Sequence, residues 1–227
     1  MPGRSRGKMT PPAKPVAPPA GPGRGQHQPV EIERIVLAGH RSQGTRFLGR
    51  VLATAGMNKG HNVTWLPMFS PTVREATVHC TVLVSREQIG SPLAGVPDVV
   101  LALDAGDCEL FRPRIKPGGI LLYDTGAMEG LAESFRDDIR TIGLPATSMA
   151  EELGQPLLAG AVMVGAFAGC SKLLDERSVQ EALRRLLETS DPLKLLEADR
   201  RAVEEGARYV RERRYMYNRY AYSIFMR

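Results

Sequence analysis

Residues 32–60 read IERIVLAGHRSQGTRFLGRVLATAGMNKG, which predicts a strand, a tight loop and a helix. Ile35 to Ala38 form an apolar run of the length of a buried strand, and the run stops at Gly39. From Gly44 onward, apolar residues recur on one helix face: Phe47, Leu48, Val51, Leu52 and Ala55. Gly60 lies where a left-handed residue would end this helix. The stretch is therefore the first half of a βαβ unit.

The loop between this strand and this helix has features of a phosphate-binding turn. Such loops aim backbone N–H groups and a helix N-terminus at an anion. The glycine spacing is that of a P-loop, but Thr45 and Arg46 stand where Lys and Ser/Thr should follow. Arg41 replaces the second glycine of a dinucleotide loop. These residues alone favour a turn without a ligand, and an anion site stays open.

Length and composition bound the class of protein. The 227 residues, 43% of them apolar, suffice for one α/β domain with an appended segment. No run of 18 or more apolar residues and no signal-type apolar region occur, so we expect a cytoplasmic protein without a membrane span. Cysteine and histidine spacing predicts neither disulfides nor a metal site, and any iron–sulfur cluster is expected in another chain.

The net charge of +5 has a local origin. Residues 1–30 are rich in Pro and Gly and carry five basic residues and no acid, which predicts a disordered basic tail. The remaining chain balances 25 basic against 25 acidic residues, so a nucleic-acid-binding domain is not expected.

Several apolar segments follow the first unit and end in Asp, Gly or Pro. We expect strands over residues 61–66, 76–85, 98–103, 120–123 and 139–144. Asp104 and Asp124, at strand ends, are interpreted as caps, Asp107 as the N-cap of a short helix, and His79 as a packed residue. The fold class is therefore α/β, an open Rossmann-like sheet of about five or six mostly parallel strands with flanking helices.

The C-terminal third is predicted to be helical. Residues 147–153 and 178–187 have helical spacing, whereas residues 157–170 are apolar all round and predict a helix buried against the sheet or another subunit. Asp191-Pro192 would begin a final helix. We expect three regions: a tail (1–30), an α/β domain (31–190), and a C-terminal helix and arm (191–227).

The last twenty residues hold five tyrosines and six arginines. These residue types are enriched at protein–protein interfaces, and interleaved basic and aromatic residues also suit single-stranded nucleic acid. We favour a helical arm that docks another subunit, because the folded body offers no continuing basic groove.

With these elements in order, residues 33–187 resemble the gamma subunit or domain of the 2-oxoacid:ferredoxin oxidoreductases, most closely the 2-oxoglutarate branch. The family's first loop, G-x-G-G-Q-G, matches at Gly39, Gln43 and Gly44. Its second loop and strand match at Pro67, Pro71, Arg74, Thr77 and Cys80. Further matches follow at residues 89–92, 97–98, 116–119 and 152–154. Several weak matches in their proper structural context are stronger than any one of them.

The departures from the family pattern fall on the two loops. Glycines of the family are replaced by Arg41, Ser42 and Ser70, and a pair of glycines by Glu75-Ala76. Thr72 stands where the family has a glutamate. Bare backbone that could approach a phosphate is thereby lost, so a contact with a coenzyme at these loops is expected to be altered.

The resemblance implies an enzyme complex that decarboxylates a 2-oxoacid on thiamine diphosphate with Mg²⁺. Electrons would pass through [4Fe–4S] clusters to ferredoxin, and the acyl group to coenzyme A. The resemblance further implies that alpha, beta and delta-type subunits are the partners and hold these cofactors, and the lack of clustered cysteines in this chain agrees with that. No catalytic or metal-binding residue is expected here, and this subunit would not be active alone.

The sequence offers five candidate binding residues. It also leaves open two functions other than that of an oxidoreductase subunit. Gly39, Gln43, Gly44, Thr45 and Arg74 are predicted to contact coenzyme A or a neighbouring subunit. A guanidinium beside a proline-bounded loop would suit a carboxylate or phosphate, and an intersubunit ion pair is an equal alternative. A scaffold that keeps the fold, or a free-standing nucleotide-binding protein, remain as alternative functions.

Overall fold

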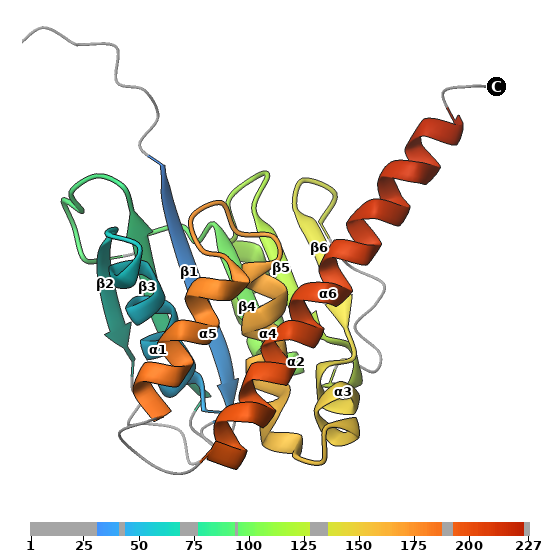
Figure 1. The fold of residues 1–227 in the computed structure, drawn as a ribbon. Coiled ribbons are helices and arrows are strands. Elements are labelled where there is room, and N and C mark those ends of the chain that lie inside the picture. Colours follow the sequence, from blue (N-terminus) through green and yellow to red (C-terminus); the bar gives the residue numbers. More distant parts are fainter. Residues whose placement is uncertain are drawn as a thin grey trace, which may run out of the picture.

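The computed structural model describes residues 31–40, 44–68, 77–93, 95–127, 136–187 and 193–224 (Figure 1). Six strands form one sheet in the order β2-β3-β1-β4-β5-β6. Their bounds are β1 Ile32–His40, β2 Asn62–Pro67, β3 Thr77–Ser85, β4 Val99–Ala102, β5 Ile120–Asp124 and β6 Arg140–Leu144. Each predicted strand is present, with its ends moved by a few residues at most.

The direction of the strands agrees with the predicted, mostly parallel sheet. β1, β4, β5 and β6 pair in parallel, whereas β3 runs antiparallel to both of its neighbours, β1 and β2. β2 consequently runs in the same direction as β1, and β3 alone is reversed among the described strands. The fold class predicted from the sequence is confirmed.

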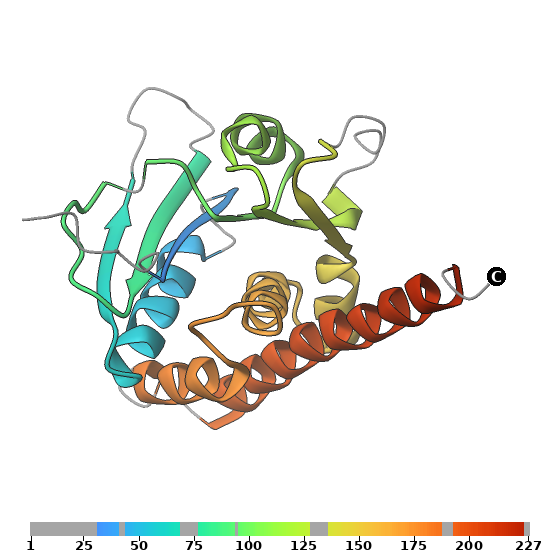
Figure 2. The same cartoon turned by 90° about the horizontal axis from the view of Figure 1, so that it is seen from above.

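The two faces of the sheet are covered unequally (Figure 2). One face carries α1, α3 and α4, with α5 and α6 packed outside them, and the opposite face carries α2. The bounds are α1 Thr45–Asn58, α2 Ala105–Phe111, α3 Ala146–Glu152, α4 Ala159–Ala168, α5 Glu176–Leu187 and α6 Leu193–Ile224. Short 3₁₀ turns lie at Arg112–Arg114, Thr125–Ala127 and Pro156–Leu158.

β1 supplies both cores because its side chains alternate between the two faces. Ile35 and Leu37 enter the large core beneath α1 and α4. Val36 and Ala38 enter the smaller core beneath α2. A continuous apolar run is thus needed for a strand that is covered on both sides.

α4 is the buried helix that the apolar run over residues 157–170 predicts. All ten of its residues are buried, and it packs between the sheet and α6. The crossing with α6 is very close, since a Cβ on Gly165 would lie 2.1 Å from the Val203 carbonyl oxygen and one on Gly206 would lie 1.9 Å from the Val162 carbonyl oxygen. Bare backbone on both helices makes this approach possible.

Helix ends confirm one expectation and correct another. Gly60 follows α1 with φ +77°, the left-handed conformation predicted for it. Asp107 is not an N-cap: the cap of α2 is Asp104, whose carboxylate accepts the Asp107 N–H at 2.8 Å, and Asp107 is buried in the first turn. The interpretation of Asp104 as a cap is thereby confirmed, and that of Asp107 is wrong.

The C-terminal region contains one long helix. α6 continues without a break from Leu193 through most of the Arg/Tyr-rich stretch. The predicted start at Asp191-Pro192 and the predicted tail of residues 1–30 lie outside the described residues. The division into three regions stays a prediction.

Candidate functional site

The candidate site residues belong to the edge of the sheet where the parallel strands end. His40, the last residue of β1, pairs with Thr77, the first residue of β3. Positions 41–43 and 69–76 therefore both connect to the sheet at this edge. Gln43 and Arg74 lie outside the described residues, so the structure locates Gly39, Gly44 and Thr45 among the five predicted site residues.

Gly44 determines how the chain enters α1. Its φ is +69°, and a Cβ there would meet no atom within 4 Å, so the backbone conformation rather than lack of space requires glycine. Its carbonyl accepts the Leu48 N–H at 3.0 Å, while no side chain caps the helix and no acidic residue lies in its first turn. A 14-residue helix that begins in this way presents positive potential to an anion.

Thr45 is fixed to the neighbouring strand by Cys80. Thr45 is 1% exposed, and its carbonyl accepts the Cys80 thiol at a distance of 3.4 Å. Burial raises the pKa of Cys80 to about 12, although the Trp65 indole beside it opposes the rise. A thiol held in the protonated form is a packing group, so Cys80 positions the start of α1 and is no nucleophile.

Gly49 leaves the space that this thiol occupies. A Cβ on Gly49 would lie 2.1 Å from Cys80 Sγ and 3.0 Å from Trp65 Nε1. We expect Gly49→Ala to lower the free energy of unfolding by about 2 kcal/mol, because the overlap exceeds the gain in helix propensity. Cys80→Ala alone should cost about 1 kcal/mol.

A double-mutant cycle distinguishes this overlap from other causes. Gly49→Ala combined with Cys80→Ala should recover most of the lost stability, because the second change removes Sγ. Denaturant unfolding followed by fluorescence of Trp65, the one tryptophan of the chain, measures all four proteins. Purely additive losses would show that Sγ does not limit this position.

The adjacent strand end contributes a pair of carboxyl groups, of which Asp107 is buried and Asp104 is partly exposed. Asp107 is 1% exposed, and neither of its side-chain oxygens has a hydrogen-bond partner. Burial, followed by the influence of Asp104, raises the pKa of Asp107 to about 8. A protonated Asp107 can donate to the Asp104 carboxylate, which itself caps α2. The sequence pattern of two aspartates three residues apart gave no indication of this burial.

His79 and Asp124 have structural surroundings, as expected. The His79 ring meets the Phe111 ring edge-on at 5.1 Å, and burial, with a smaller contribution from Arg114, lowers the pKa of His79. The Asp124 carboxylate accepts the N–H groups of Gly126 and Thr147, each at 3.2 Å, and the Thr147 hydroxyl. Asp124 thus caps the first turn of α3, and its interpretation as a cap is confirmed.

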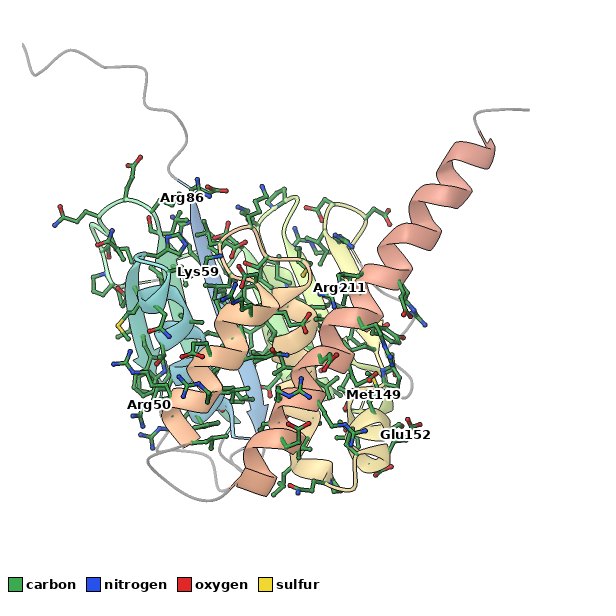
Figure 3. The ribbon with its side chains drawn as sticks, in the orientation of Figure 1. Arg50, Lys59, Arg86, Met149, Glu152 and Arg211 are labelled. Atoms are coloured by element: carbon green, nitrogen blue, oxygen red, sulfur yellow. The ribbon has the colours of Figure 1, made fainter. Side chains whose placement is uncertain are left out.

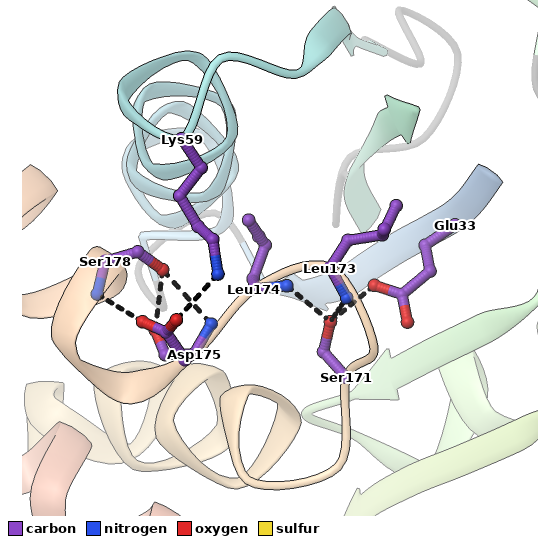
Figure 4. A network of polar contacts seen from close by, with 7 residues as sticks. All are labelled: Glu33, Lys59, Ser171, Leu173, Leu174, Asp175 and Ser178. Carbon is purple, nitrogen blue, oxygen red and sulfur yellow. Dashed lines mark hydrogen bonds and ion pairs between the residues drawn. The ribbon is translucent and has the colours of Figure 1, made fainter. Parts of the chain in front are cut away.

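At the opposite end of the parallel strands, polar contacts join β1 to the segments next to α1 and α5 (Figure 4). Glu33 on β1 accepts the Ser171 hydroxyl, and the same hydroxyl oxygen accepts the N–H of Leu174 at 3.0 Å. Lys59, just after α1, bonds to Asp175 at 2.6 Å, and Asp175 caps α5 through the Ser178 N–H at 2.8 Å. These contacts join β1, α1 and α5 at the end of the sheet opposite to the candidate site.

Three surface hollows lie away from the candidate site. One runs along β6 and α6, a second lies between α3 and α6, and a third lies at the opposite edge around Glu33, Asp98 and Lys116. Gly39, Gly44 and Thr45 line none of the three. Among the described residues, no group of three His, Cys, Asp or Glu side chains is arranged to hold a metal ion.

Comparison with known proteins identifies the family. The model of the pyruvate ferredoxin/flavodoxin oxidoreductase family matches residues 34–209. The chain belongs to this family. The predicted resemblance to gamma subunits of 2-oxoacid:ferredoxin oxidoreductases is confirmed, and the matched region begins in β1 and reaches well into α6.

Similar curated proteins fall into two kinds. The ketoisovalerate oxidoreductase subunit VorA of Methanothermobacter marburgensis is 32% identical over 180 residues, which is 79% of this chain and 37% of VorA. The 2-oxoglutarate synthase subunit KorC of Methanothermobacter thermautotrophicus is 27% identical over 188 residues, covering 79% of this chain and 100% of KorC. The chain therefore spans about a third of the length of VorA and aligns with the whole of KorC.

Solved structures share the fold. The gamma subunit of a keto/oxoacid ferredoxin oxidoreductase from Geobacter sulfurreducens has a TM-score of 0.66 and 22% identity, covering 78% of this chain and 98% of that one. The 2-oxoglutarate:ferredoxin oxidoreductase of Magnetococcus marinus, solved with 2-oxoglutarate, coenzyme A and succinyl-CoA bound, has a TM-score of 0.70 and 20% identity. This similarity covers 80% of this chain and 31% of that chain.

None of the described helices is both long and apolar enough to cross a membrane. The expected cytoplasmic location stays a prediction, as do the five candidate contacts with coenzyme A or a neighbouring subunit.

Proposed function

We propose that this chain is the gamma subunit of a multisubunit 2-oxoacid:ferredoxin oxidoreductase. The observation that carries the proposal is the family match over residues 34–209, together with alignment along the full length of KorC. In the complex, the chain positions neighbouring subunits and contributes the edge formed by the β1–α1 turn. The reaction oxidatively decarboxylates a 2-oxoacid to an acyl-coenzyme A and passes electrons to ferredoxin.

Among the described elements at this edge, the start of α1 has features that suit an anionic part of coenzyme A. Gly44 adopts the conformation that opens the helix N-terminus, no acidic side chain opposes an anion there, and Arg46 lies in the first turn. We propose that Gly44 and Thr45 approach a phosphate group, with Gln43 and Arg74 as the side chains that orient it. Coenzyme A supplies the thiol that accepts the acyl group.

Thiamine diphosphate, Mg²⁺ and [4Fe–4S] clusters are assigned to alpha, beta and delta-type subunits. The cysteines of this chain support the assignment of the clusters to other subunits. The three cysteines are distant in sequence, and Cys80 and Cys108 are buried. Burial raises the pKa of both thiols, which disfavours the thiolate that iron requires.

The substrate is the finer question, and two 2-oxoacids are candidates. The sequence predicts 2-oxoglutarate, and KorC supports that branch through its full-length alignment. The higher identity of VorA supports ketoisovalerate as a second candidate. Steady-state assays of the native complex with both acids, coenzyme A and ferredoxin compare them directly: the true substrate should show the higher kcat/KM by at least about tenfold.

Arg74 provides a test of the proposed coenzyme A contact. In the intact complex, Arg74→Ala should raise the KM for coenzyme A by about tenfold, because removing one charge-assisted contact costs about 1.5 kcal/mol. Arg46→Ala removes an arginine from the first turn of α1. Its KM for coenzyme A, compared with that of Arg74→Ala, shows how much of the change is specific to Arg74. Steady-state kinetics at varied coenzyme A concentration measure both variants.

The scaffold alternative predicts a different result. If turnover and the KM for coenzyme A stay unchanged in Arg74→Ala and in the Gln43→Ala/Arg74→Ala pair while the complex still assembles, these residues form no site. The chain would then act only in holding subunits together. A free-standing nucleotide-binding protein would instead bind ATP or a dinucleotide when purified alone.

A further inference from the structure

The two loops of the proposed site have their described ends on one strand, β3, and its neighbours. The first loop joins β1 to α1 and ends at Gly44, and the second joins β2 to β3. Across the second loop, Pro67 pairs with Cys80. The Met68 N–H donates to the His79 carbonyl there at 2.9 Å. Because β3 also pairs with β1 along its whole length, one strand holds the ends of both loops.

A hydrogen bond from β3 holds the first turn of α1. No side chain forms a capping hydrogen bond at the N-terminus of this helix, where Gly44 is the N-cap. The thiol of Cys80 instead donates to the Thr45 carbonyl at 3.4 Å, and both residues are almost completely buried. A side chain without a donor at position 80 would leave this bond unmade.

The helix backbone lies directly against the same sulfur. A Cβ on Gly49, about one turn after Thr45, would lie 2.1 Å from Cys80 Sγ and 3.0 Å from Trp65 Nε1. The indole of Trp65, on β2, therefore lies beside both the thiol and the helix. Any shift of the helix start away from β3 would open this packing and break the hydrogen bond together.

The far end of α1 rests on the same strand through a different residue. A Cβ on Gly56 would lie 3.2 Å from Val84 Cγ1. Val84 is completely buried and belongs to the same core as Cys80, four residues further along β3. Figure 3 shows Arg50 on the first half of α1 and Lys59 at its far end. Cys80 thus supports the end of α1 that adjoins the proposed site, and Val84 supports the opposite end.

We propose that Cys80 is a positioning residue for the coenzyme A contact. The inference rests on the proposed function and adds the group that fixes the geometry of that site. Through the Thr45 carbonyl, Cys80 ties the start of α1 to the strand that follows the second loop. Both loops then face one anion at a fixed separation, and a site arranged in advance loses less freedom when the ligand binds. Cys80 itself touches no ligand.

Two substitutions of Cys80 in the intact complex separate the hydrogen bond from the packing. Cys80→Ala removes the donor and should raise the KM for coenzyme A about fivefold, which is the worth of one neutral hydrogen bond, while kcat changes less than about twofold. Cys80→Ser also loses the volume of sulfur but keeps a donor, so its KM should stay within about twofold of the wild type. A KM that is unchanged in Cys80→Ala, or raised equally in both variants, overturns the inference.

Val84→Ala is the matched control. It removes buried volume from the same strand beneath the same helix, and it should lower the stability of the chain at least as much as Cys80→Ala. Its KM for coenzyme A should nevertheless stay within about twofold of the wild type. A rise as large as that of Cys80→Ala would show that general loosening of α1 sets the affinity, and it would contradict the positioning role.

Arg74→Ala separates this inference from the proposed function. If Arg74→Ala raises the KM for coenzyme A and Cys80→Ala does not, coenzyme A binds at the site and the positioning role is wrong. If neither variant changes the KM, the proposed contact with coenzyme A is wrong, and the positioning role fails with it.

Hydrogen exchange on the wild-type complex covers the case in which a variant does not assemble. Saturating coenzyme A should slow the exchange of the amides of residues 45–48 and of residues 77–80 together, by at least about threefold, because the thiol joins these two segments. Exchange that coenzyme A leaves unchanged in either segment overturns the inference.

Discussion

Replacing Gly206 by alanine should lower the free energy of unfolding by about 3 kcal/mol and the Tm by roughly 6–12 °C. A Cβ at this position would lie 1.9 Å from the Val162 carbonyl oxygen and 2.9 Å from the Ala166 nitrogen, both backbone atoms of α4. No rotamer change relieves contact with backbone, so α6 must move away from α4. The cost exceeds the gain of about 1 kcal/mol that alanine brings to a helix.

The position of Gly206 explains why the effect should be large. The buried face of α6 repeats with helical spacing through Ala202, Val203, Ala207 and Val210. Gly206 lies in the middle of this face, and Gly165 is its counterpart on α4. Moving the helices apart would expose the whole interface rather than one side chain.

A control and a contrary result accompany this prediction. Gly106→Ala in α2 should not lower the free energy of unfolding and should raise it by up to about 1 kcal/mol, because its Cβ would meet the nearest atom, Asp104 Oδ1, at an ordinary 3.5 Å. Calorimetry on both variants makes the comparison. An unchanged or raised Tm for Gly206→Ala would show that the two helices are not held at this distance.

Asp107→Asn should remove a loss of stability that the wild-type protein suffers as pH rises from 6 to 9. Asp107 is buried without a hydrogen-bond partner, and its pKa is raised from 3.8 to about 8 in the folded protein. The folded state therefore binds a proton that the unfolded state has already released. Its stabilising contribution is fully present below pH 3.8 and is lost as pH rises through about 8.

The size of the effect between pH 6 and 9 follows from the roughly two pH units between pH 6 and the folded-state pKa of about 8. Between pH 6 and 9 the wild type should lose roughly 2 kcal/mol relative to Asp107→Asn, whose amide stays neutral. Urea unfolding at a series of pH values measures the difference. The variant Asp137→Asn, at an exposed carboxylate, should retain the wild-type profile, and parallel profiles for all three proteins would show that Asp107 is already ionised in the fold.

The fold was predictable because local patterns and burial agree along most of the chain. The run from Ile35 to Ala38 is apolar on both faces and lies in the middle of the sheet. Gly60 is left-handed where the sequence places a helix end. The all-apolar stretch at residues 157–170 became the buried helix α4, because a helix without a polar face must be covered all round.

Contacts between segments that are distant in the chain could not be predicted from the sequence. Gly165 and Gly206 are 41 positions apart, and nothing local shows that their backbones meet. The same holds for Cys80 and Gly49, which share one space beside Trp65. Both Asp104 and Asp107 were interpreted as caps, and only Asp104 is one, because the two aspartates have similar preferences and burial distinguishes them.

The candidate site stays a prediction, although the structure locates three of its five residues, Gly39, Gly44 and Thr45. The resemblance located the loops at Gly39–Gly44 and around Arg74, and the pairing of His40 with Thr77 brings their flanking residues to one edge. Gly44 has the backbone conformation that an anion-binding turn uses. The contribution of Gln43 and Arg74 stays a prediction, because it depends on side chains outside the described residues.

Purification of the native complex through a tag on this chain tests the central claim most directly. The chain should elute in fixed stoichiometry with subunits that carry thiamine diphosphate and iron–sulfur clusters, and the eluate should reduce ferredoxin when given a 2-oxoacid and coenzyme A. A chain that elutes without any cluster-bearing partner, in an eluate that oxidises no 2-oxoacid, would contradict the account.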